Sequence, residues 1–227
     1  MSKIVALHQP NYIPWLGFFS KIKHADSFVI LDNVDFDRRG ITHRNKIRVP
    51  SGFTWLTIPV SKVTLGTSIQ NIRLPESMEW QKLHWKTIER NYKKADYFYI
   101  YQDFFEKLYQ EKFEYLWQLN ERIIVFILKY LDINVEIIKT SNLNLKENLR
   151  KTDLIIKILE EVGGDVYLSG PSGKNYLDIE KFTQNNIELK FHEFEHPQYK
   201  QRYPGFEKNM AAIDLLFNIG ENSKKLI

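Results

Sequence analysis

The chain has 227 residues, of which 43% are hydrophobic and 26% are charged, proportions that are ordinary for a soluble globular protein. It has no cysteine, which excludes disulfides, thiolate nucleophiles and cysteine-based zinc or iron–sulfur sites and fits a reducing compartment. Its 32 basic and 28 acidic residues are interspersed and leave a net charge of +4, which is weak support for nucleic-acid binding. No apolar run approaches the ~20 residues of a membrane span, and the first one is too short for a signal peptide. We therefore expect a cytoplasmic protein with no membrane span and no nucleic-acid partner.

The N-terminal stretch combines a buried strand, a kinked polar loop and a helix. Ile4–Leu7 is an apolar run typical of a buried parallel strand. Two prolines interrupt the following loop, and apolar positions at helical spacing resume after it. Ligands bind at the carboxyl ends of strands in open α/β sheets, so the loop supplies four candidate ligand-facing residues, His8, Gln9, Asn11 and Tyr12. His8 suits near-neutral acid–base chemistry, although a hydrogen-bonded core histidine accounts for it equally well.

A basic stretch follows the second predicted strand, Phe28–Leu31. It runs from Arg38 to Arg48 and contains five Arg or Lys residues. Two interpretations stay open, a solvated basic loop or a clamp for a phosphate or carboxylate. The clamp would use Arg44, Asn45 and Lys46.

Helical spacing dominates the middle of the chain, from about residue 78 to residue 131. It predicts a helix over Met78–Lys94 and a long helical region from about Phe104 to Leu131, with a strand-like piece at Asp96–Tyr101 between them. His84 shares a helix face with Trp80, so it is either buried and hydrogen-bonded or directed into a pocket.

A second polar loop follows the strand predicted at Asp165–Leu168. Its small residues, two glycines and a lysine favour binding of an anion through backbone N–H groups, although the spacing is not that of a P-loop. The candidate binding residues of this loop are Ser169, Gly170, Ser172 and Lys174.

The C-terminal part begins with a rigid polar turn that contains His196, Tyr199 and Gln201. The last predicted helix places Asp214 among apolar residues, where an unpaired carboxylate is unfavourable. A structural hydrogen-bonding role for Asp214 is therefore favoured over the orientation of a histidine.

The order of the elements predicts a single α/β domain over residues 1–227. Buried strands alternate with helical stripes, which indicates a largely parallel central sheet flanked by helices, with the helical region 78–131 packed on it. Further strands are expected at Phe53–Val60, Val135–Ile138 and Ile187–Phe191. The polar connector Asn142–Arg150 is expected to be a flexible loop.

Several long motifs give the chain a resemblance to a known family. They comprise His8–Phe19, Arg44–Ile47, Trp55–Val60, Tyr167–Gly170 with Tyr176–Asp178, His196–Tyr199 with Gln201, and Ile213–Asn218 before Gly220. Over nearly its whole length the chain resembles the WbqC-like family of bacterial proteins, whose genes commonly sit among those for surface polysaccharide and O-antigen. A weaker, fold-level similarity is to nucleotidylyltransferase-like (Rossmann-like) enzymes, including adenylate-forming ligases. Those enzymes hold ATP phosphates with a His-x-Gly-His loop, whereas here no second histidine follows His8 at that spacing.

The resemblance implies an enzyme of lipopolysaccharide sugar biosynthesis, a transferase that attaches an acyl or aminoacyl group to the amine of a nucleotide-linked sugar. His8, His84 and His196 are candidate bases for such a reaction. The polar residues of the three loops and the basic stretch are candidate contacts to the ligand. Two alternatives stay open, a non-catalytic protein that binds a sugar nucleotide or glycan and an ATP-dependent adenylate-forming ligase. The sequence predicts no metal site and identifies neither a cofactor nor the donor, the sugar or the oligomeric state.

Overall fold

The computed structural model describes residues 2–61, 63–145 and 149–227, and its contacts divide the chain into two compact units. The sheet unit comprises the described residues of Met1–Gln9, Ser20–Asn33 and Asn134–Glu195. The hairpin unit comprises those of Pro10–Phe19, Val34–Ile133 and His196–Ile227. The chain therefore passes repeatedly from one unit to the other, and a single domain over the whole chain stays a prediction. Residues 146–148 of the predicted connector lie outside the described residues.

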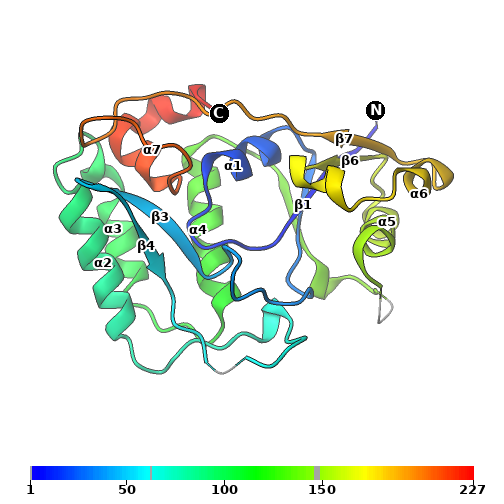
Figure 1. Ribbon diagram of the computed structural model, residues 1–227, viewed down its shortest axis with the longest axis horizontal. Helices are drawn as coiled ribbons and strands as arrows, with labels where there is room; N and C mark the ends of the chain where they lie inside the picture. The colour runs from blue at the N-terminus through cyan, green and yellow to red at the C-terminus, as the bar shows by residue number, and fades with distance from the viewer. Residues whose placement is uncertain (1, 62, 146–148) are drawn as a thin grey trace. The chain divides into compact units, whose positions relative to one another are not determined.

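Five parallel strands form the centre of the sheet unit (Figure 1). They are β1 (Ile4–His8), β2 (Ser27–Ile30), β5 (Glu136–Lys139), β6 (Val166–Ser169) and β7 (Glu188–Phe191). Their order is β5-β2-β1-β6-β7, and every neighbouring pair is parallel. The predicted α/β class with a parallel central sheet is confirmed.

The strand order reverses direction between β1 and β6. From β1 the chain adds β2 and then β5 on one side, and it returns to add β6 and β7 on the other side. The first five strands of a dinucleotide-binding sheet follow the same order, and its ligands bind at the carboxyl ends of the strands where the direction reverses. The fold therefore marks the carboxyl ends of β1 and β6 as the position for a ligand.

One face of the sheet is covered by α5 (Lys151–Val162) and α6 (Ile179–Gln184). Val5 and Leu7 of β1 belong to the core on this face, which also contains the following buried residues: Val29, Ile155, Ile158, Leu159, Tyr167 and Phe182. Because side chains alternate along a strand, Ala6 and His8 point to the opposite face. A left-handed glycine, Gly163 at φ 66°, ends α5.

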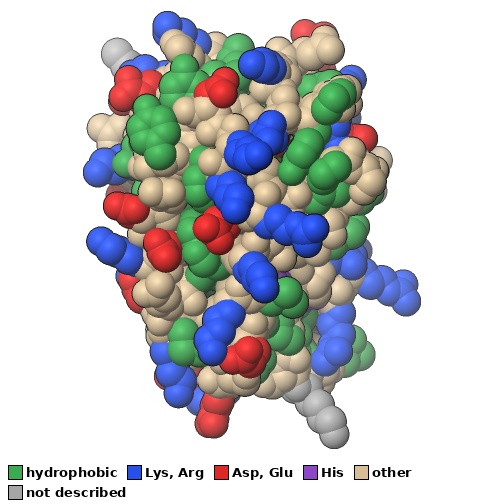
Figure 2. Space-filling view, turned by 90° about the vertical axis from the view of Figure 1, so that its left-hand side faces the viewer, with side chains coloured by type: hydrophobic (Ala, Val, Ile, Leu, Met, Phe, Trp, Pro, Cys, Tyr) green, Lys and Arg blue, Asp and Glu red, His purple; other side chains and the backbone are tan. Residues whose placement is uncertain are grey.

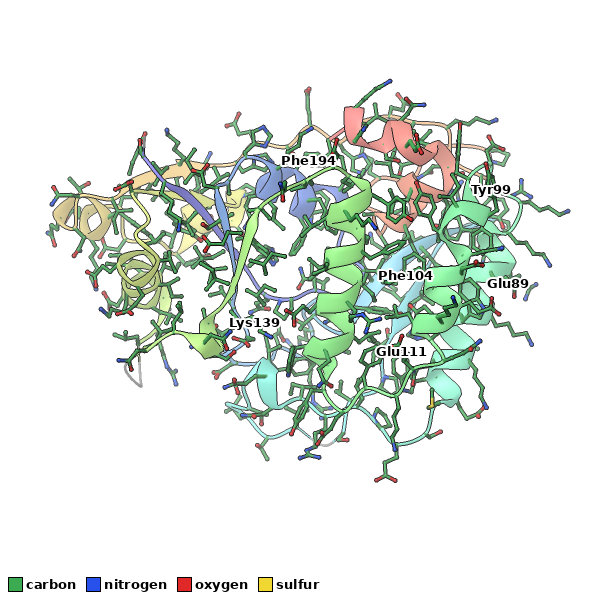
Figure 3. The ribbon with its side chains drawn as sticks, turned by 180° about the vertical axis from the view of Figure 1, so that it is seen from behind. Glu89, Tyr99, Phe104, Glu111, Lys139 and Phe194 are labelled. Carbon is green, nitrogen blue, oxygen red and sulfur yellow. The ribbon has the colours of Figure 1, made fainter. Side chains whose placement is uncertain are left out.

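The hairpin unit contains an antiparallel hairpin and most of the helices (Figure 1). Its elements are β3 (Arg44–Val49), β4 (Gly52–Thr57), α2 (Glu79–Tyr92), α3 (Phe98–Leu108), α4 (Leu116–Tyr130) and α7 (Ile213–Ile219). Helix α1 (Leu16–Lys23) begins in the hairpin unit and ends in the sheet unit. Aromatic side chains fill much of the helical packing, and Phe104, labelled in Figure 3, stacks on Phe126 with ring centroids 3.6 Å apart.

Three local predictions are wrong. The second half of the basic stretch Arg38–Arg48, predicted as a loop, lies in strand β3 (Arg44–Val49), in which Asn45 and Ile47 are buried while Arg44 and Lys46 are only half-buried. The strand-like piece at Asp96–Tyr101 enters α3, because its aromatic residues continue the buried stripe of that helix. The long helical region is two helices, since a polar segment after Tyr109 interrupts the apolar stripe.

Candidate functional site

The carboxyl edge of the sheet brings together residues from three strands. Ala6 pairs with Leu168, so His8 at the end of β1 and Ser169 at the end of β6 lie at the same edge on neighbouring strands. The N–H of His192, directly after β7, donates to the carbonyl oxygen of Ser169 at 2.8 Å. Because side chains alternate along a strand, the side chain of Ser169 projects from the sheet face that α5 covers. The side chain of His8 projects from the opposite face.

Lys21 of α1 belongs to this edge, although no sequence motif marks it. Its side chain is only 4% exposed, and its ammonium donates a hydrogen bond of 2.7 Å to the carbonyl oxygen of Leu7 in β1. Burial away from water disfavours the charged form and lowers the pKa of Lys21 to about 7. Perturbed groups of this kind cluster at functional sites. The sequence does contain one indication that Lys21 is buried, because it lies within the apolar helical stripe of Phe18, Phe19 and Ile22.

His8 does not titrate near neutrality, contrary to the expectation from its residue type. Burial, together with the charge of Lys21, lowers its pKa to about 3. Its Nδ1 lies 3.0 Å from the carbonyl oxygen of Gln9. Since a carbonyl only accepts, Nδ1 carries the proton of the neutral ring and Nε2 keeps a lone pair. His8 is therefore a neutral hydrogen-bonding group at pH 7 and a weak base.

His192 extends this cluster of basic groups. Its Nε2 lies 3.1 Å from Oγ of Ser20, and its ring lies 5.3 Å from that of His24. Burial lowers the pKa of His192, and the charges of His24 and Lys21 lower it further. Sequence analysis missed His192 because only the fold places it beside β6.

The second polar loop forms a short 3-10 helix, Pro171–Asn175, at the end of β6. Its backbone N–H groups at Gly173 and Tyr176 donate to carbonyl oxygens of the same loop. Gly173 packs so closely on Ser169 that a Cβ there would clash with the Ser169 hydroxyl. The loop therefore offers the exposed side chains of Ser172 and Lys174 to a ligand rather than a cradle of free N–H groups.

Asp32, just after the end of β2, has a structural role. Asp32 is 2% exposed. It accepts hydrogen bonds from Oγ1 of Thr140 at 2.8 Å and from the N–H and Oγ of Ser141 at 2.9 and 2.6 Å. It therefore fastens the end of β2 to the end of β5.

In the hairpin unit, two asparagines hold the N-terminal polar loop from Pro10 onward. Nδ2 of Asn45 donates to the carbonyl oxygens of Ile13 at 2.6 Å and Tyr12 at 3.3 Å. Nδ2 of Asn120 donates to those of Pro10 and Thr42 at 2.7 and 2.8 Å. Ile13 has a φ of 40°, which is strained for a β-branched residue and persists because these bonds fix the loop.

His84 is a buried, hydrogen-bonded histidine. Its Nδ1 lies 2.8 Å from the hydroxyl of Tyr12, which also contacts the hydroxyl of Tyr109. Burial lowers the pKa of His84 to about 4. Tyr12 is fully buried, so both side chains support the helical core around them.

The C-terminal turn is tied to a buried carboxylate. Asp214 accepts hydrogen bonds from the hydroxyls of Tyr92 and Tyr199, both at 2.8 Å, and from Nε2 of Gln201 at 2.9 Å. His196 is half-buried, and its Nδ1 donates to the carbonyl oxygen of Pro197 at 2.9 Å. Tyr199 and Gln201 therefore have a structural role here.

The predicted anion clamp is an aromatic and basic surface of the hairpin. The guanidinium of Arg44 lies 4.9 Å from the ring centroid of Trp55, and the ammonium of Lys46 lies 4.6 Å from that of Phe53. Arg44 also donates to the carbonyl oxygens of Gly40 and Arg39.

The predicted residues thus fall into two sets. The sheet unit holds His8, Gln9, Ser169, Gly170, Ser172 and Lys174. The hairpin unit holds Asn11, Tyr12, Arg44, Asn45, Lys46, His84, His196, Tyr199 and Gln201. The sequence also predicts that six of them converge on one cleft, namely His8, Arg44, Asn45, Ser169, Ser172 and His196, and this stays a prediction.

Across the described residues, none of the helices has the length and apolarity needed to cross a membrane. In the same part of the chain, no group of three or more His, Cys, Asp or Glu side chains is arranged to hold a metal ion.

Comparison with known proteins identifies the family. The model of the WbqC-like protein family matches residues 9–226. "Uncharacterized protein Rv1507c" of Mycobacterium tuberculosis (strain ATCC 25618 / H37Rv) is 33% identical over 222 residues, which cover 96% of this chain and 94% of that protein. No solved structure matches. The chain belongs to the WbqC-like protein family.

Proposed function

We propose that this WbqC-like protein binds a nucleotide-linked amino sugar at the carboxyl edge of its parallel sheet and transfers an acyl or aminoacyl group to the sugar amine. The observation that carries the proposal is the reversal of strand order between β1 and β6, with polar loops following both strands. Sheets of this order bind nucleotides at that point.

Lys21 is the best group at this edge to accept a proton. At pH 7 a pKa of about 7 leaves roughly half of its side chains neutral. In the proposed step, the nitrogen of the sugar amine attacks the acyl carbonyl carbon, and the bond between that carbon and its leaving group breaks. The neutral amine of Lys21 accepts the proton that the sugar nitrogen loses. Lys174 supplies an exposed cation for the diphosphate.

Binding without catalysis is the second candidate, and the low pKa of His8 favours it. A base with a pKa of about 3 accepts few protons at pH 7, so His8 alone is poorly suited to activate an amine. The same neutral ring is well suited to a fixed hydrogen bond with a ligand.

One experiment separates the two candidates. The protein is incubated with a uridine-diphosphate-linked amino sugar and an acyl-CoA, with and without ATP, and mass spectrometry records acylated sugar while calorimetry records binding. Lys21→Met is expected to keep binding and to lower turnover ~10²–10⁴-fold. Lys23→Met, which removes an exposed lysine from the same helix, is the matched control and is expected to leave turnover unchanged. Binding without product in the wild-type protein favours the binding-only function, and equal turnover in Lys21→Met contradicts the role of Lys21.

A further inference from the structure

A cleft lies within the hairpin unit, between β4, the turn before it and α2. Its volume is about 660 Å³, within the range of small-molecule sites. Two wall residues are aromatic, Phe53 of the hairpin and Tyr203 of the C-terminal segment. The residues that line the cleft all belong to the hairpin unit, whereas the residues of the proposed site at the sheet edge all belong to the sheet unit.

One stripe of α2 supplies cations to this cleft. Lys86 and Arg90 are one helical turn apart, share the stripe with Leu83 and Thr87, and are exposed. No acidic side chain is among the described residues that line the cleft, and Glu89, labelled in Figure 3, does not line it. Figure 2 shows the side of the molecule on which α2 lies, with Lys and Arg side chains in blue exposed among hydrophobic ones in green.

Arg48 adds a third positive charge beneath the residues that line the cleft. Arg48 is 3% exposed, and its guanidinium donates only to neutral carbonyl oxygens in the described contacts, those of Val49, Gly52 and Pro204, each at 2.6 Å. It lies 5.8 Å from the ring centroid of Tyr203, and its buried Nε has no hydrogen-bond partner among the described residues. Arg48 also attracts the buried carboxylate of Asp214, which offsets part of its charge. Its guanidinium therefore adds only partly to the positive potential that Lys86 and Arg90 give the cleft.

The remaining wall groups suit a ring with hydroxyl groups. Phe53 lines the cleft and is 45% exposed, and the ammonium of Lys46 lies 4.6 Å from its ring centroid. Its exposed apolar area can pack against a sugar or base. Ser51, Thr54 and Thr87 line the same cleft, although the hydroxyl of Thr87 donates to the carbonyl oxygen of Leu83 at 2.7 Å. Asn91 is less available, because its amide bonds the carbonyl oxygen of Thr87 and the hydroxyl of Tyr203.

We propose that this cleft binds the phosphate ester of a ring compound, with Lys86 and Arg90 on the phosphate and Phe53 against the ring. The site is additional to the proposed site at the edge of the sheet and does not depend on it. Sugar phosphates and nucleoside monophosphates share this chemistry, and the choice of probe distinguishes them.

Calorimetry on the full chain at low salt tests the proposal with inorganic phosphate, glucose 1-phosphate and uridine monophosphate. At least one of the two esters is expected to bind more tightly than inorganic phosphate, and the tighter ester identifies the ring. Arg90→Gln is expected to weaken ester binding about tenfold, the scale of a hydrogen bond to a charged group. Phe53→Ala is expected to weaken binding of the ester but not of inorganic phosphate. Lys107→Gln, which removes an exposed charge of α3 outside the cleft, is expected to change neither.

Three results overturn the proposal. They are no binding of either ester, equal weakening by Lys107→Gln and Arg90→Gln, and binding of a single-stranded RNA far more tightly than of the monophosphate. Thermal melting of each variant serves as the control for folding. We expect every variant to fold, because the substituted side chains are exposed. The Lys21→Met variant retains ester binding at this cleft, so failure here is distinguishable from failure of the proposed transferase function.

Discussion

The ammonium of Lys21 donates a hydrogen bond of 2.7 Å to the backbone carbonyl oxygen of Leu7, next to the carboxyl end of β1. The bond connects α1 to the strand beside the reversal of strand order. A neutral carbonyl stabilises a buried ammonium less than a carboxylate does, so the lysine is poised to lose its proton near pH 7.

The stability of the protein is expected to rise with pH through the range in which Lys21 titrates. The unfolded chain holds this proton up to a pKa of 10.5, whereas the folded protein holds it only up to about 7. Between those values the unfolded state binds more protons, so this group raises the free energy of unfolding by up to ~1.4 kcal/mol per pH unit. Urea unfolding of Lys21→Met should show a gain in stability over the wild-type protein at neutral pH that shrinks toward pH ~10. An equal difference at both pH values would show that Lys21 keeps its ordinary pKa.

His8 is expected to stay neutral across the physiological range. Its pKa is lowered from 6.5 to about 3, so its contribution to stability is present above the ordinary pKa and is lost as pH falls from 6.5 toward about 3. Nitrogen-15 NMR of the imidazole, assigned with His8→Gln, should show the Nδ1-protonated neutral tautomer from pH ~8 to ~5. A titration midpoint near neutrality would restore His8 as a candidate general base.

Asp214 is expected to be among the most sensitive positions of the hairpin unit. Asp214→Ala leaves the donors of Tyr92, Tyr199 and Gln201 without their acceptor and should lower the free energy of unfolding by ~3 kcal/mol. Tyr199→Phe removes one donor and should cost ~1 kcal/mol. The control is Asp96→Ala, since that carboxylate is 67% exposed and 3.9 Å from Lys200. Similar losses at both aspartates would contradict a structural role for Asp214.

The N-terminal polar loop is expected to depend on the amide of Asn120. Asn120→Asp places a carboxylate against the carbonyl oxygens of Pro10 and Thr42 in a fully buried position. The loss of both donors and the buried charge should destabilise the protein by ~3 kcal/mol or more in chemical unfolding. Asn185→Asp removes a similar bond to the carbonyl oxygen of Lys181, but an exposed one, and should cost well under half as much. Equal costs would show that Asn120 is not the anchor of the loop.

Local sequence patterns predicted most of the sheet unit because buried parallel strands and amphipathic helices have distinct spacings. Apolar runs at Ile4–Leu7 and Asp165–Leu168 became β1 and β6, and the polar residues after them lie at the carboxyl edge of the sheet. The sequence motifs are also sufficient to identify the family. Patterns failed at Arg44–Val49, where basic side chains on one face obscured the alternation of a strand.

The residue sequence by itself determined the strands of the sheet unit, the family and the polar loops that follow β1 and β6, because each depends on neighbours within a few positions. Only the tertiary structure decided which polar residues form hydrogen bonds that hold the fold together and which have shifted pKa values. His84 and Asp214 form hydrogen bonds with residues far away in the sequence, Tyr12 and Tyr92 respectively. These bonds explain why the two polar side chains are buried. Lys21 acquires its pKa of about 7 from burial, and burial depends on which distant segments pack around a side chain.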